Sequence, residues 1–135
     1  MRQILDHKIA STAAFTAAVH GGASLPSHAH DAVAINVIDP PGSGGASHVY
    51  DVVLPNGKCT RVEFQNGPVT EAGINGLTQE VLLAIVIDRL RSFQSGPFAC
   101  EANGNALGFV EEALHCLHDR TRERMGRGVE GKHAA

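Results

Sequence analysis

The fold is decided by residues 78–127, which read TQEVLLAIVIDRLRSFQSGPFACEANGNALGFVEEALHCLHDRTRERMGR. In the first part of this stretch, apolar side chains recur three or four residues apart, as on the buried flank of an amphipathic helix. They are Leu82, Leu83, Val86, Ile87, Leu90 and Phe93. Thr78 is placed to cap this helix. Gly96 and Pro97 end it, because glycine accepts the left-handed conformation and proline cannot continue a helix.

A second helical pattern follows, and the two together predict an antiparallel helical hairpin over residues 78–127. Its apolar stripe is formed by Ala106, Val110, Ala113 and Leu117. At about 100° per residue the stripe continues to Arg120 and Arg124, so we expect both arginines to point toward the buried side. A guanidinium there needs an anionic or aromatic partner. The alternative is a solvated helix end, with the arginines held by the helix dipole and by nearby carboxylates. Those carboxylates are Glu111, Glu112, Asp119 and Glu123.

Composition limits both the size and the partners of the protein. Its 135 residues, 43% of them hydrophobic, suffice for one domain with a modest core. The formal charge of −3 argues against general binding to DNA or RNA, although basic residues gather near the C-terminal end. They are Arg120, Arg122, Arg124, Arg127 and Lys132. Any anion that the protein binds is therefore expected to be small.

Cysteine usage favours a reducing compartment. Cys59, Cys100 and Cys116 form an odd, scattered set that does not resemble the disulfide framework of a secreted chain. The N-terminal residues lack the layout of a signal peptide, and no stretch is long enough to span a bilayer. We therefore expect a soluble cytoplasmic protein without a membrane partner.

A small antiparallel β-sheet is predicted over residues 32–77, ahead of the hairpin. The β-branched run 32–38 predicts one strand, and residues 48–54 and 58–65 predict two more around Pro55-Asn56-Gly57, a strong hairpin signal. Such short neighbouring strands favour a meander. The fold class is therefore α+β. Residues 71–77 are predicted to be a loop leading into the first helix.

The two ends of the chain are less defined. Residues 1–31 are interpreted either as an arm that orders on a neighbouring subunit or as a flexible leader. Residues 128–135 are expected to be a loose tail. Within the chain, FQNGP at 64–68 recurs as FQSGP at 93–97, once after a predicted strand and once after a predicted helix. We interpret this echo as the same way of ending an element, used twice, and not as a structural repeat.

Several chemistries are not supported by residue spacing. His28 with His30, and His115 with His118, lack further ligands at a diagnostic spacing, so no metal is expected. The cysteines lack the local sequence of a nucleophile and no serine elbow is present. The glycine-rich residues 42–45 lack the Lys-Ser/Thr of a phosphate loop and are most simply a strand connector. We therefore expect a protein that is not an enzyme and has no cofactor.

A site for a small nucleotide agrees better with the residues. Phe93 offers a ring for a base and Asn103 an amide for its edge or a ribose, while Arg120 and Arg124 form a fork for a diphosphate. Alternatively, Phe93 lies in the core and Asn103 is a turn or cap residue. Along the second helix the arginines lie roughly 25 to 30 Å beyond Phe93 and Asn103 at 1.5 Å per residue. If all four contact one ligand, the site lies between two chains and the protein is at least a dimer.

Residues 62–133 also carry a series of short motifs. They are FQNGP (64–68), GINGLT (73–78), AIVIDRL (84–90), FQSGPFAC (93–100), RTRER (120–124) and RGVEG (127–131). In these motifs the chain resembles the phage-encoded Thoeris anti-defence family one. The resemblance is dense over the C-terminal half, loose over residues 48–65, and slight over the first thirty or so residues.

This resemblance implies a fold, a ligand and an assembly. The family has a small β-sheet followed by a long helical hairpin, which it shares with anti-CBASS cyclic-nucleotide sponges. Its members sequester glycocyclic ADP-ribose, the messenger that a TIR enzyme makes in Thoeris immunity, without cleaving it. They are dimers or hexamers in the host bacterial cytoplasm. The family's stacking phenylalanine falls on Phe93, its polar asparagine on Asn103, and its phosphate-binding arginines on Arg120 and Arg124.

Two alternatives and some departures remain at this stage. Some hexameric members also hold CBASS cyclic di- or trinucleotides at separate sites, so such oligonucleotides are a second expected ligand class. A phage protein-interaction module without a nucleotide ligand is the third interpretation. Gly104 and Gly108 stand where helix formers are expected, which predicts a looser turn end. His115 and Cys116 replace the bulkier residues of the family pattern.

Overall fold

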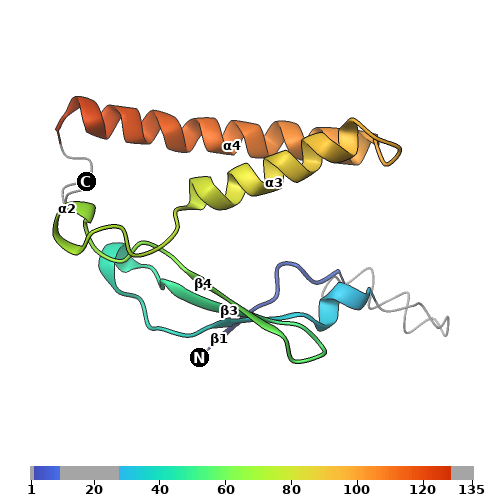
Figure 1. The fold of residues 1–135 in the computed structure, drawn as a ribbon, viewed down its shortest axis with the longest axis horizontal. Coiled ribbons are helices and arrows are strands. Elements are labelled where there is room, and N and C mark those ends of the chain that lie inside the picture. The colour runs from blue at the N-terminus through green and yellow to red at the C-terminus, as the bar shows by residue number, and fades with distance from the viewer. Residues whose placement is uncertain (1, 10–27, 129–135) are drawn as a thin grey trace. The chain divides into compact units, whose positions relative to one another are not determined.

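A computed structural model of the protein describes residues 2–9 and 28–128. The chain divides into two compact units, residues 1–63 and 64–135. The first unit carries an antiparallel β-sheet and the second carries the helices (Figure 1). The predicted α+β class is therefore confirmed, with the sheet ahead of the helical hairpin in the chain.

The sheet has its strands in sequence order, β1-β2-β3-β4, and each pairs antiparallel with the next. The strands are β1 (Arg2–Ile4), β2 (Ala34–Val37), β3 (Val49–Val53) and β4 (Cys59–Glu63). The last three lie inside the three predicted strand segments. A short 3-10 turn, η1 (Ala29–Ala32), precedes β2, and Val37 in β2 is only 3% exposed.

The first strand comes from the segment interpreted as an arm. Arg2 pairs with Val37 and Ile4 with Ile35, so the start of the chain adds a strand to the meander. A strand of three residues is too short for alternation to reveal it. The rest of the segment interpreted as an arm or leader falls largely on residues 10–27, and the tail on residues 129–135; both lie outside the described residues.

A carboxylate closes the connection between β2 and β3. Asp39 accepts hydrogen bonds from the main-chain N–H groups of His48, at 2.9 Å, and Val49, at 2.9 Å, while the Ser47 hydroxyl donates to the Asp39 carbonyl. The Val49 N–H, followed by that of His48, lowers the pKa of Asp39 below its usual value. The glycine-rich residues 42–45 are therefore the strand connector that the sequence predicts.

The second unit begins with a loop that is closed by side-chain amides. Gln65 Nε2 donates to the Gly73 carbonyl at 2.8 Å, and the Asn75 N–H donates to Gln65 Oε1 at 3.0 Å. A Cβ atom on Gly76 would lie 2.4 Å from the Phe64 carbonyl carbon, so the two backbone segments approach too closely for any side chain there. In FQNGP at 64–68, the first copy of the repeated motif, the Gln65 amide thus holds the loop that follows β4.

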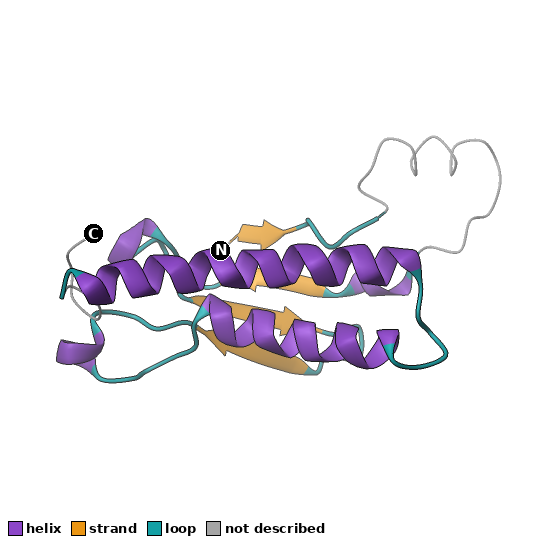
Figure 2. Cartoon of the chain, turned by 90° about the horizontal axis from the view of Figure 1, so that it is seen from above, coloured by secondary structure: helices purple, strands orange, loops and turns teal. Residues whose placement is uncertain are grey.

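The helices of the second unit are α2 (Val69–Ala72), α3 (Gln79–Gln94) and α4 (Glu101–Gly126). α3 and α4 lie side by side along the hairpin (Figure 2). Thr78 caps α3 as predicted, since its hydroxyl accepts from the Val81 N–H. The predicted loop over residues 71–77 is wrong at its start, because α2 extends to Ala72. Pro68 precedes this single turn, and Gly73, with a φ of 70°, ends it.

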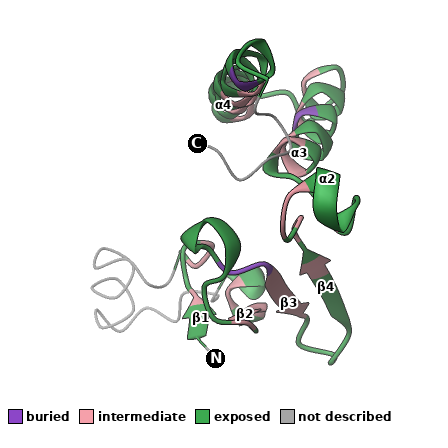
Figure 3. Cartoon of the chain, turned by 90° about the vertical axis from the view of Figure 1, so that its left-hand side faces the viewer, coloured by how far each residue is buried: buried purple, intermediate pink, exposed green. Residues whose placement is uncertain are grey.

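The residues of α4 that are least exposed are not all those of the predicted apolar stripe. The less exposed residues of α4 include Leu107, Val110, Leu114, Leu117, Thr121 and Arg124. Ala106 and Ala113 are exposed, because the larger leucines one position later gain more from burial. Arg124 is buried as predicted, but the prediction is wrong for Arg120, which is exposed. Exposed residues cover most of both helices (Figure 3).

Candidate functional site

At the turn end of the hairpin, Phe93 presents an accessible ring. It lies in the last turn of α3 and is 38% exposed, so it is not the core residue of the alternative interpretation. The Arg89 Cζ atom lies 5.4 Å from the centre of the ring, within the range of a cation–π contact. A partly exposed aromatic ring can stack against a flat base.

Asn103 lies in the first turn of α4, on the other side of the hairpin turn from Phe93. It is not the N-cap of this helix, because Cys100 holds that position and accepts from the Asn103 N–H at Sγ. The Asn103 side chain donates from Nδ2 to the Phe98 carbonyl at 3.4 Å. This bond is long, so the amide is weakly held and remains suited to exchanging its partner for a ligand.

Gln94 joins the ends of the two helices, and sequence reasoning did not identify it as a site residue. Its Oε1 accepts from the Cys100 N–H at 3.0 Å, and its Nε2 donates to the Cys100 carbonyl at 3.1 Å. We call this pair of bonds the Gln94 clamp. A Cβ atom on Gly104 would lie 3.0 Å from Gln94 Nε2, so this glycine leaves room for the clamp. Gly104, which the sequence predicts to loosen the turn, thus lies against the clamp. Nothing in the described part of the structure explains Gly108.

At the other end of α4, Arg120 and Arg124 lie one helical turn apart. The carboxylates expected to hold them are mostly engaged elsewhere, since Glu111 accepts from Arg91 at 2.8 Å and Asp119 from Arg122 at 3.2 Å. Glu123 pairs with Arg127. Arg120 is exposed, and among the described residues it makes no hydrogen bond or ion pair. This end therefore offers an exposed guanidinium that an anion can reach.

The structure brings the four predicted residues together only in pairs. Phe93 and Asn103 lie on either side of the hairpin turn, whereas Arg120 and Arg124 lie near the end of α4. Because α4 runs without interruption from Glu101 to Gly126, about 25 Å separates Asn103 from Arg120 at 1.5 Å per residue. A mononucleotide is too short to contact both pairs in one chain.

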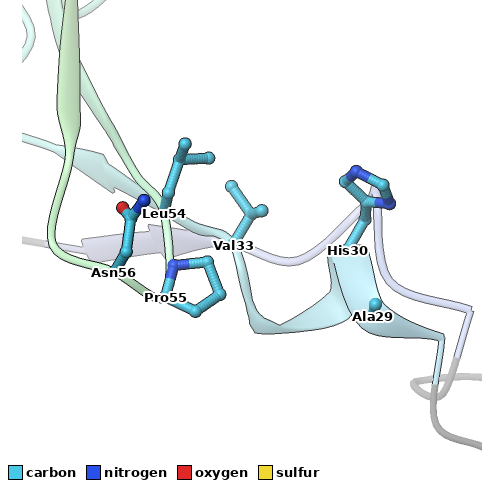
Figure 4. A pocket seen from close by; sticks show the side chains of 6 residues that line it. All are labelled: Ala29, His30, Val33, Leu54, Pro55 and Asn56. Carbon is cyan, nitrogen blue, oxygen red and sulfur yellow. The ribbon is translucent and has the colours of Figure 1, made fainter.

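A separate hollow lies in the sheet unit (Figure 4). It has a volume of about 340 Å³ and opens widely to solvent. It is lined by Ala29, His30, Val33, Leu54, Pro55 and Asn56. Its lining is mostly apolar and includes no lysine or arginine, so it offers little to a phosphate. None of the four predicted ligand residues lines it.

Three further observations concern residues 2–9 and 28–128 alone. No helix there is both long and apolar enough to cross a bilayer. Histidines, cysteines and carboxylates do not gather there in threes in a way that would hold a metal ion. Cys59, Cys100 and Cys116 are all exposed.

The sheet and the helical hairpin define a small α+β protein whose candidate ligand groups lie at the two ends of one hairpin. No protein-family profile matches the chain. Over 92 residues it is 50% identical to "Thoeris anti-defense 1" of Bacillus phage SBSphiJ7. The match covers 68% of this chain and 65% of the phage protein, just under two thirds of that relative's length. This similarity supports the assignment of the chain to the Thoeris anti-defence family.

Proposed function

We propose that this protein counteracts bacterial Thoeris immunity by binding glycocyclic ADP-ribose and withholding it from the downstream effector without cleaving it. Membership of the anti-defence family supports the target pathway. The choice of ligand is supported by the chemistry of the hairpin, where Phe93 and Asn103 suit a base with its ribose, and Arg120 and Arg124 suit a pyrophosphate.

The separation of these two pairs carries the proposal. On one unbroken helix, Asn103 and Arg120 lie about 25 Å apart, so a cyclic ADP-ribose isomer contacts both pairs only when two hairpins contribute. The turn end of one chain then meets the arginine end of another. The protein is accordingly a homo-oligomer, a dimer or a hexamer, acting in the host bacterial cytoplasm.

Isothermal titration calorimetry on the full chain tests this function. We expect glycocyclic ADP-ribose to bind, linear ADP-ribose to bind more weakly, and the cyclic ligand to be recovered chemically intact after the protein is heat-denatured. Light scattering should give a mass of at least two chains. A monomeric mass, no binding of the cyclic ligand, or recovery of a hydrolysed ligand would each contradict the proposal. A cyclic trinucleotide titrated in parallel reports whether the ligand class is the CBASS one instead.

A further inference from the structure

We propose that Gln94 is a positioning residue of the ligand site, which fixes Asn103 relative to Phe93 across the hairpin turn. This inference rests on the proposed function. Gln94 directly follows the ring-bearing Phe93 as the last residue of α3. Its amide bonds both main-chain groups of Cys100, the residue three positions before Asn103.

The clamp acts on Asn103 through the start of α4. The Cys100 carbonyl accepts both from Gln94 Nε2 and, at 3.0 Å, from the Gly104 N–H of the first helical turn. The Cys100 thiol accepts from the Asn103 N–H. Gln94 therefore holds the residue that caps and starts α4, and with it the backbone of Asn103. Among the described residues, the Asn103 side chain makes a single hydrogen bond, of 3.4 Å, so its position depends on that backbone.

Gly104 supports the same conclusion from the opposite side of the clamp. A methyl group there would approach Gln94 Nε2 to 3.0 Å, closer than nearly all ordinary Cβ contacts. A glycine inside a helix costs up to about 1 kcal/mol relative to alanine. In this protein the glycine lies in α4 at the position next to the Gln94 amide, where a larger residue would crowd the clamp.

The chain contains a matched control for this test. Gln65 occupies the same place in the first copy of the Phe-Gln-x-Gly-Pro motif, and its amide also bonds a main-chain carbonyl and a main-chain N–H of a later segment, those of Gly73 and Asn75. Its clamp closes the loop before α3 and involves none of the four predicted ligand residues. Gln94→Ala and Gln65→Ala therefore remove similar bonds at different places.

The first experiment compares ligand affinity with stability. Glycocyclic ADP-ribose is titrated into full-length wild type, Gln94→Ala and Gln65→Ala at a temperature where circular dichroism shows each to be folded. Both variants should lose some thermal stability, but only Gln94→Ala should bind more weakly, by about tenfold, as expected when two hydrogen bonds that hold the site are lost. Equal affinity of Gln94→Ala and wild type would overturn the inference, as would an equal loss in Gln65→Ala.

A second variant keeps the test decisive if Gln94→Ala does not fold. In Gln94→Glu a carboxylate still accepts from the Cys100 N–H but lacks the donor for the Cys100 carbonyl, whereas the protonated acid has both. At pH 7.5, well above the ordinary glutamate pKa of about 4.3, Gln94→Glu carries the carboxylate and faces the Cys100 carbonyl with an acceptor instead of a donor. This variant should therefore bind glycocyclic ADP-ribose more weakly than wild type. Affinity equal to that of wild type would overturn the inference. If wild type binds no cyclic ligand, the proposed function itself fails.

Discussion

The two ends of the α3–α4 hairpin surround their candidate ligand groups with different interactions. At the turn end, neutral hydrogen bonds of Gln94 and Cys100 fix the start of α4, which carries Asn103. At the arginine end, the neighbouring side chains form exposed ion pairs, such as that of Arg122 with Asp119. The proposed binding should therefore have a part that salt weakens and a part that it does not, because exposed charges are screened and ring stacking is not.

Removing both arginines is expected to have the largest effect. The double variant Arg120→Ala, Arg124→Ala should bind glycocyclic ADP-ribose at least about 100-fold more weakly, since hydrogen bonds to charged groups contribute about 1.5–3 kcal/mol each. Titrations at several salt concentrations should also show that the remaining binding depends less on salt. Arg122→Ala removes the same kind of charge from the same helix and is the control. A similar loss in Arg122→Ala would mean that only overall charge matters.

Loss of the ring should have the next largest effect and should leave the salt dependence unchanged. Phe93→Ala is expected to weaken binding by roughly 10- to 100-fold, as stacking of a base on an aromatic side chain contributes about 1–3 kcal/mol. Phe93→Tyr keeps the ring and should retain most of the affinity, whereas Phe93→Leu keeps only apolar volume and should not. If Leu and Tyr bind equally well, Phe93 does not stack on the ligand.

Mixing these two defective chains tests whether the ends meet between subunits. In a mixed dimer, one site combines the intact ring of one chain with the intact arginines of the other. Co-refolding Phe93→Ala with the Arg120→Ala, Arg124→Ala variant should therefore restore tight binding at about one quarter of all sites, if chains pair at random. Calorimetric stoichiometry measures this fraction. No recovery in the mixture would indicate that each ligand is bound within a single chain.

The smallest expected effect concerns an ion pair between the two ends. Arg91 on α3 and Glu111 on α4 pair at 2.8 Å, but their side chains are 63% and 43% exposed. Such surface pairs contribute at most about 1 kcal/mol, less at high salt. Arg91→Ala should lower the thermal midpoint by a few degrees at most and leave ligand affinity unchanged. A double-mutant cycle with Glu111→Ala measures the coupling, and a clear change in affinity would show that the two ends are not independent.

Much of the fold could be predicted because its signals are local. Helical periodicity and the Asn56-Gly57 turn located the hairpin and three strands, whereas β1 has too few residues to show alternation. On α4, two adjacent stripes share Val110, Leu117 and Arg124, so periodicity alone could not separate them. The structure chooses the stripe with Leu107 and Leu114, which is why Arg124 was placed correctly and Arg120 was not.

Only some of the candidate site residues could be predicted from the sequence, because the others depend on contacts between distant parts of the chain. Residue type identified Phe93 and the two arginines as candidates, but Gln94 appeared to be only part of a helix end. Its contact with Cys100 depends on where the chain returns after the turn. The one available signal was the echo of the first motif, in which the glutamine stays the same while the next residue changes from Asn66 to Ser95.

The unbroken length of α4 fixes the distance between Asn103 and Arg120. One extra residue between Asn103 and Arg120 would lengthen the helix by about 1.5 Å and turn the guanidinium groups by about 100° around its axis. The shortest insertion that returns them to within about 20° of their original direction has about seven residues, and it would add about 10 Å. Natural variation in this segment should therefore consist of substitutions, with insertions and deletions confined to the turn before Cys100 or to the residues after Gly126.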